Sequence, residues 1–255
     1  MKRVLLTAVL AALPLCCVFA SGDPEQFGTK YSAKVNWKVA QGIHLMASEE
    51  VHLGPSFNFE KTTTTLGGTY KLSNFMKVGL AYSAIGVSKK SGLDWRHRAS
   101  LHLSESYKWD QLHLSFKESF QATYRVKEDL NTYQNPRTKL VFKARAKASY
   151  KPVHSRFTPY AQAEARFLLN GANWVSDDGT TYSFDGYNDL YFSRLRLQAG
   201  TEFRFDLQHA IELYVHYDYL IDKDVDYSRS LGQLQTITIS QYPYLGLGVG
   251  YLFSF

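Results

Sequence analysis

Cysteine is nearly absent from this 255-residue chain, because Cys16 and Cys17 are its only two and both stand within residues 1–20. That segment has two basic residues at its start, then an apolar stretch, and ends on the small residue Ala20. This is the pattern of a secretory signal peptide cleaved after Ala20. A lipoprotein signal is disfavoured because Leu15, rather than a small residue, precedes the cysteines. We therefore expect an exported protein without disulfides.

Long hydrophobic runs are also missing. After residue 20 no run of about 18 apolar residues remains, which is the length that a transmembrane helix requires. Aromatic residues are nevertheless abundant, with 18 Tyr, 16 Phe and 4 Trp. Only a closed β-barrel could then cross a membrane, because every backbone polar group in lipid must be paired internally.

Charge of one sign is not in large excess. The whole chain has 29 Lys and Arg against 23 Asp and Glu. Without Lys2 and Arg3 the difference is 27 − 23, or +4. This is too small to indicate nucleic acid as a partner, and no nucleic-acid motif accompanies it. The sequence also contains no phosphate loop, metal-binding cysteine cluster or dinucleotide fingerprint, so we expect neither a metal nor a cofactor.

Alternation of apolar and polar residues, with the length of tilted membrane strands, fills most of the remaining chain. It predicts ten strands, near 43–53, 58–72, 75–87, 95–108, 111–126, 138–150, 156–170, 189–205, 209–223 and 236–255. Residues 31–40 alternate as well and would be an eleventh. Because both ends of a bacterial barrel lie in the periplasm, the strand number should be even. We therefore interpret 21–42 as a periplasmic segment or an extension of the first strand, and 43–255 as the barrel.

The connections between these strands alternate in length. Short turns are predicted at 73–74, 109–110, 151–155 and 206–208, and longer polar loops at 88–94, 127–137, 171–188 and 224–235. Bacterial outer-membrane barrels have short periplasmic turns and long outer loops. The fold class expected is therefore an all-β, transmembrane antiparallel β-barrel of about ten strands in the bacterial outer membrane, preceded by a cleaved signal peptide.

The last strand is the most regular. Its odd positions from Pro243 to Phe255 are apolar or aromatic, and most of its even positions are small. A chain that ends on Phe with Phe253 and Tyr251 before it resembles the C-terminal β-signal of bacterial outer-membrane barrels. That resemblance implies the barrel assembly machinery as a partner, together with the lipid bilayer.

The faces predicted to point into the barrel are densely charged. The inward charges that we single out are Lys139, Lys143, Arg145, Lys147, Glu164, Arg166, Arg194, Arg196, Glu202, Arg204 and Glu212. One interpretation is a hydrated network of ion pairs that fills the lumen. The alternative is a constriction lined by cations that favours a small anionic solute, for which the four basic residues on strand 138–150 argue most strongly.

Three acidic residues do not fit the predicted faces. Glu49, Glu105 and Glu118 fall on the outward phase of their strands, where a carboxylate costs free energy in lipid. A β-bulge that reverses the phase is the explanation that we favour for Glu49 and Glu118, because one extra residue re-aims every side chain after it.

Part of the sequence resembles a known family. Residues 159–167 have a Tyr-x-x-x-Glu pattern, 193–203 an Arg-x-Arg-x-x-x-Gly pattern that ends at Gly200, and 209–214 a third strand that ends in Tyr. These strands are similar to a family of outer-membrane proteins known only as a domain of unknown function. The resemblance implies a barrel of this size and no known activity. Gly200 would make room for a bulky neighbour on the adjacent strand.

Two further hypotheses concern ligands and catalysis. His216 and Asp218 share the inward face of one strand and could form the acid–base pair of a rim-located, protease-like hydrolase. Pairing of Asp218 with Arg196 is the alternative that we favour. The 171–188 loop combines aromatic rings with carboxylates, which suits a surface ligand-binding protein or a loop that closes the barrel mouth. The chain is expected to be non-enzymatic.

Overall fold

The computed structural model describes residues 27–54, 57–89, 92–127, 136–176, 182–228 and 233–255. The signal peptide predicted for residues 1–20 lies outside this part of the chain. The strands are β1 (Phe27–Ala40), β2 (Ile43–Leu53), β3 (Phe59–Lys71), β4 (Met76–Lys89), β5 (Gly92–Trp109), β6 (Leu112–Arg125), β7 (Thr138–Tyr150), β8 (Phe157–Ser176), β9 (Tyr182–Arg204), β10 (His209–Ser228) and β11 (Gln233–Ser254). No helix among these residues is long and apolar enough to cross a membrane.

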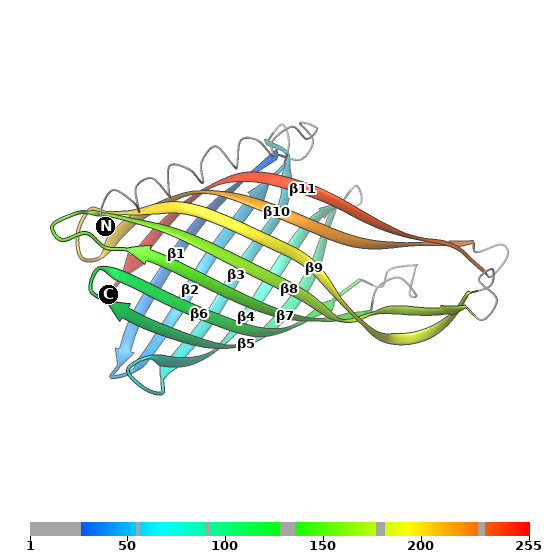
Figure 1. Ribbon diagram of the computed structural model, residues 1–255, viewed down its shortest axis with the longest axis horizontal. Coiled ribbons are helices and arrows are strands. Elements are labelled where there is room, and N and C mark those ends of the chain that lie inside the picture. The colour runs from blue at the N-terminus through cyan, green and yellow to red at the C-terminus, as the bar shows by residue number, and fades with distance from the viewer. Residues whose placement is uncertain (1–26, 55–56, 90–91, 128–135, 177–181, 229–232) are drawn as a thin grey trace.

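The strands form one closed barrel in which each strand pairs with its neighbours in sequence (Figure 1). Consecutive strands are antiparallel, whereas β1 closes the barrel by pairing parallel to β11, from Phe27 opposite Leu245 to Asn36 opposite Ser254. The described residues therefore hold eleven strands, and the prediction of about ten is wrong. The segment 31–40 is not a periplasmic extension but most of β1.

β1 stands between β2 and β11 and pairs with both of them, so the barrel closes through β1. An odd count makes β1 and β11 run in the same direction, so their junction has to be parallel. The expectation of an even strand number assumed that the first and last strands of the barrel pair antiparallel, whereas β1 and β11 pair parallel.

The two ends of the barrel differ, as predicted. The connections at 41–42, 72–75, 110–111, 151–156 and 205–208 all lie at the end where the chain terminates (Figure 1). Several of them use left-handed backbone, with φ of 79° at Gly42, 52° at Asp110 and 62° at His154. The four predicted short turns are therefore confirmed in position.

At the opposite end the described residues of three predicted loops, 88–94, 171–188 and 224–235, belong to strands instead. β8, β9, β10 and β11 are 20, 23, 20 and 22 residues long and continue beyond the other strands (Figure 1). The predicted loop 171–188 belongs to β8 and β9 apart from residues 177–181, which lie outside the described part. The Trp174 and Phe184 rings meet edge to face at 5.4 Å, with Ile237 of β11 beside them. This apolar cluster gives the extension a core of its own, so it does not fold over the mouth.

The barrel wall has its apolar face outside and its polar face inside. Leu80 and Leu213 are 66% and 52% exposed. The buried side chains are mostly polar and include Lys30, His102 and Ser119. This inversion of an ordinary globular core is the pattern expected of a barrel that is surrounded by lipid.

The three outward carboxylates remain outward, and the proposed bulges are absent at those positions. The β2–β3 register shifts only between His52 and Leu53, after Glu49. The ladders that contain Glu105 and Glu118 have no register shift. Glu49 instead accepts hydrogen bonds from the hydroxyls of Thr62 and Thr64 on β3. Neighbouring hydroxyls, rather than a change of phase, therefore accommodate this charge.

Candidate functional site

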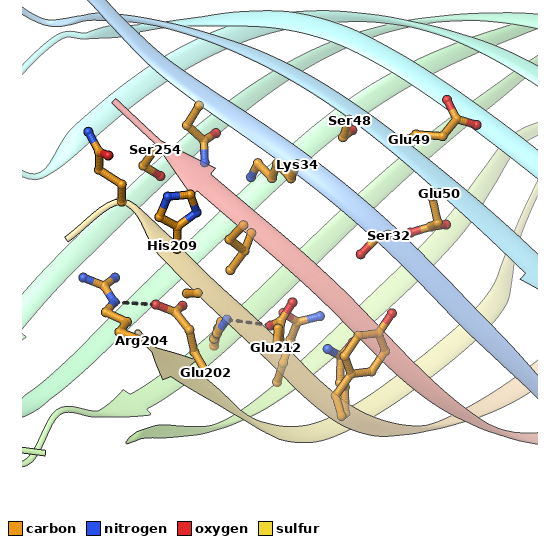
Figure 2. Close-up of a pocket in the computed structure, with 18 of the residues that line it drawn as sticks. Ser32, Lys34, Ser48, Glu49, Glu50, Glu202, Arg204, His209, Glu212 and Ser254 are labelled. Carbon is orange, nitrogen blue, oxygen red and sulfur yellow. Dashed lines mark hydrogen bonds and ion pairs between the residues drawn. The ribbon is translucent and has the colours of Figure 1, made fainter. Parts of the chain in front are cut away.

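A polar cavity of about 640 Å³ opens at the short-turn end of the barrel. We call it the vestibule. Its walls come from strands on both sides of the parallel seam, with Lys34 on β1, Glu50 on β2 and Glu212 on β10 among the side chains around it (Figure 2). The turn between β9 and β10 also contributes, with Asp206. The vestibule is therefore a space within the barrel, not a groove on its outer wall.

Charges near the vestibule mouth are balanced by one another. Arg204 Nε donates to Glu202 Oε1 at 2.6 Å, as the dashed line in Figure 2 shows. Lys147 Nζ lies 3.7 Å from Glu212 Oε1 and also 3.7 Å from the centre of the Tyr160 ring. The mouth therefore presents both signs of charge and by itself favours neither cations nor anions.

Asp206, in the turn beside the vestibule, is held by backbone amides. Its carboxylate accepts hydrogen bonds from the N–H groups of Gln208 and His209, both at 2.7 Å. These two donors lower the pKa of Asp206 from its ordinary value because they stabilise the ionised form. The ionised carboxylate of Asp206, which is present above its lowered pKa, therefore stabilises the turn.

A layer of ion pairs lies at the inner end of the vestibule. Arg196 on β9 makes two hydrogen bonds to the Asp218 carboxylate on β10, both at 2.6 Å. Arg194 donates to Glu164 on β8 at 2.7 Å, and its second terminal nitrogen lies 3.9 Å from Asp218. The predicted pairing of Asp218 with Arg196 is confirmed. Four inward charges that were predicted separately therefore form one network across β8, β9 and β10.

A row of basic residues follows directly beyond this layer. Lys143 on β7 stands opposite Arg166 on β8, and Arg166 stands opposite Arg194 on β9. We call these three residues the basic row. In the same register, Ser119 on β6 is opposite Lys143 and His102 on β5 is opposite Ser119. Five neighbouring strands thus contribute hydrogen-bonding side chains and no carboxylate at this level of the lumen.

The acids of the ion-pair layer neutralise only part of the basic row. Of its three cations, only Arg194 has a carboxylate within 4 Å among the described residues. The Nε atoms of Arg166 and Arg194 are buried and have no hydrogen-bond acceptor in that part of the protein. Buried donors without acceptors are uncommon because each costs free energy.

Further basic side chains line the lumen between the basic row and the end of the barrel opposite the short turns. Arg98 on β5 donates from Nε to the Thr123 hydroxyl at 3.0 Å. Lys139 on β7 stands opposite Thr123 and has no carboxylate within 4 Å among the described residues. Arg96 is paired at 2.9 Å with Asp94. On this side of the lumen, over β5 to β9, positive charge therefore exceeds negative charge.

A second charged cluster was not predicted from the sequence. Lys30 on β1 stands opposite His52 on β2, which stands opposite Lys61 on β3. Lys30 is buried, and His52 contacts the Glu50 carboxylate. The prediction missed Lys30 because it excluded β1 from the barrel. The Thr62–Thr65 run in β3 also shows no alternation from which an inward face could be recognised.

The structure does not place His216 at a rim. Its ring is 1% exposed, and neither ring nitrogen has a hydrogen-bond partner in the described part of the protein. The rings of Tyr214 and Tyr244 lie at 6.0 and 5.9 Å from it. Because Asp218 is bound to Arg196, it does not orient His216. This geometry does not present a general base to water.

Glycines on β9 and β11 make room for these inward rings. A Cβ at Gly246 would lie 2.6 Å from His216 Nε2, and a Cβ at Gly248 would fall within the Tyr214 ring. At Gly200 a Cβ would lie 2.6 Å from Tyr214 Cβ, so the predicted need for room there is confirmed. The small inward face of the last strand is therefore the complement of bulky side chains on β10.

The described residues contain no group of three or more His, Cys, Asp or Glu side chains placed to hold a metal ion. No protein-family model matches the sequence, and no curated protein matches it. Among solved structures, the chain is similar to an anion-selective porin from Comamonas acidovorans, with 10% sequence identity and a TM-score of 0.34. The alignment covers 85% of this chain and 56% of the porin, so the chain spans little more than half of that porin's length. A likeness of this extent assigns no activity to the chain.

Proposed function

We propose that this protein is an integral barrel of the bacterial outer membrane, with its short turns and C-terminal strand on the periplasmic side. The exposed apolar face supports this proposal, because a soluble protein rarely exposes so continuous an apolar surface. Aromatic residues at the short-turn end, such as Trp37, Trp109 and Phe255, suit the membrane interface. The signal peptide pattern at residues 1–20 and the apolar C-terminal strand agree with insertion by the assembly machinery.

Within that membrane, we propose that the barrel is a narrow conduit that prefers small anionic solutes. The observation that carries this proposal is the excess of basic over acidic side chains in the inner lumen, centred on the basic row. A fixed positive charge in a narrow, partly dehydrated passage attracts anions and repels cations. The balanced mouth would admit both signs, so selection would take place deeper, at Lys143 and Arg166.

The size of the barrel limits what could pass. With eleven strands among the described residues, it lies between barrels of about eight strands, which side chains fill, and porins of about sixteen, which hold an open channel. The Arg196–Asp218 and Arg194–Glu164 pairs also reach into the lumen. Only small solutes could pass through a lumen of this width. Membership of the uncharacterised outer-membrane family that residues 159–219 resemble is part of the same proposal.

The test is conductance of refolded residues 21–255 in planar bilayers, with reversal potentials measured in a KCl gradient. We expect openings with chloride favoured over potassium, and a shift toward potassium in Lys143→Glu. Lys77→Glu is the matched control, because Lys77 also faces the lumen but lies next to a short turn. A silent barrel, or one with cation preference in the wild type, would refute the proposal.

A further inference from the structure

The basic row has the composition of an anion site. Its cations start from adjacent strands, where directly opposed Cβ atoms are about 5 Å apart. Lys143 supplies an ammonium that can approach an oxygen from several directions, and Arg166 supplies a planar fork that fits two oxygens. The Ser119 hydroxyl, in the same register, can donate as well. Several donors that converge from different strands can hold several oxygens of one ligand.

The unused donors point to a ligand. Arg194 uses its terminal nitrogens toward Glu164 and Asp218, so its position is already fixed by the protein. Its Nε and that of Arg166 remain buried without an acceptor among the described residues. Lys143 likewise lacks a carboxylate within 4 Å there. Such donors are satisfied when an acceptor with more than one oxygen enters between them.

We propose that the basic row is a binding site for a small oxyanion, meaning a phosphate, sulfate or carboxylate group, held chiefly by Lys143 and Arg166. The inference rests on the proposed function only for the direction of entry, and it names the class of anion that this lumen would recognise. Charge-assisted hydrogen bonds from fixed donors distinguish an oxyanion from chloride, which has no separate oxygens to accept them. Glu164 and Asp218 hold Arg194 in place and keep it from closing the site.

The vestibule ends next to this site. Glu164 and Arg196 line its inner end. Arg166 and Arg194 are each two residues away from them along β8 and β9, on the same inward face. An anion that enters from the short-turn end would therefore meet the ion-pair layer first and the basic row directly afterwards.

Binding is measured by isothermal titration calorimetry of refolded residues 21–255 in neutral detergent. Inorganic phosphate and sulfate are titrated in turn, with chloride at matched ionic strength. We expect saturable binding of an oxyanion at one site and none for chloride. Arg166→Gln and Lys143→Gln should each weaken it roughly tenfold or more, as expected when one charge-assisted hydrogen bond is lost. Lys77→Gln should bind as the wild type does.

The outcomes separate this inference from the proposed conduit. Binding that depends on Arg166 and Lys143 in a barrel that conducts nothing would refute the conduit and support the site. A conducting barrel in which neither phosphate nor sulfate binds, or binds equally in all variants, would overturn the site and leave the conduit. Circular dichroism on each variant shows whether it is folded, and a conservative Arg166→Lys should restore part of the affinity.

Discussion

The ion pair between Arg196 and Asp218 makes the sharpest prediction about stability. It combines two hydrogen bonds of 2.6 Å with side chains that are only 18% and 5% exposed. Removing one partner leaves the other charge poorly solvated, which costs about 3–5 kcal/mol in a dry interior. For Arg196→Gln we expect less, about 2–3 kcal/mol, because Arg194 lies 3.9 Å from Asp218 and partly compensates. Asp218→Asn leaves Arg196 without its carboxylate, and Arg194 has the same charge, so this variant should show the full cost.

The assay is a double-mutant cycle, with the free energy of unfolding taken from urea titrations in lipid vesicles. The double variant should cost less than the two single variants together, with a coupling energy of about 2 kcal/mol. Arg204 and Glu202 form the matched control pair, since their bond is also 2.6 Å long but the Arg204 side chain is 51% exposed. For that pair we expect a coupling below about 1 kcal/mol.

The result that would refute this reasoning is additivity within about 0.5 kcal/mol for Arg196 and Asp218. Equal coupling in the two pairs would also contradict it, because the Arg196–Asp218 pair is more buried and has two hydrogen bonds, whereas the Arg204–Glu202 pair has one. The comparison does not depend on what the barrel conducts.

Three further predictions concern separate parts of the wall. Gly246→Ala should lower the free energy of unfolding, because its Cβ would lie 2.6 Å from His216 Nε2, while the same change combined with His216→Ala should recover stability, as heat-modifiable gel migration would show. Glu49→Leu should raise stability in lipid vesicles by about 1 kcal/mol, since an outward carboxylate is unfavourable there; unchanged or lower stability would contradict its lipid-facing position. Asp206→Ala should reduce stability at pH 7, and this loss should shrink only as the pH falls below the ordinary Asp pKa of 3.8 and through the lowered pKa of the folded state, because the carboxyl stabilises the fold while it is ionised; a loss that stays equal from pH 7 to well below the ordinary pKa would contradict this.

Much of the wall could be predicted from alternation alone. The inward phase of Lys143, Arg166 and Asp218 was correct because side-chain direction in a strand changes with every residue and is therefore a local property. The pairing of Asp218 with Arg196 was anticipated for the same reason, together with the neighbouring positions of their strands. Glu49 shows the limit of this argument. Alternation placed it correctly on the outward face, but a β-bulge was then predicted to turn it inward, and no such bulge is present there.

The errors concern relations between distant residues. β1 was left out because parity was applied to a barrel that closes through a parallel pair. The strand extensions at 171–176 and 182–188 were taken for a loop because aromatic and acidic residues are mixed there. Their partners, such as Ile237 beside Trp174, come from another hairpin.

By itself, the sequence determined that the chain is all-β, which side of most strands is polar, and that the interior carries many charges. Those properties depend on a period of two along a single strand. The tertiary structure decided which charges meet, because a shift of two residues between neighbouring strands preserves every face yet changes every partner. The register between β7, β8 and β9 brings Lys143, Arg166 and Arg194 into one row, and the parallel seam between β1 and β11 adds Lys30 to the lumen.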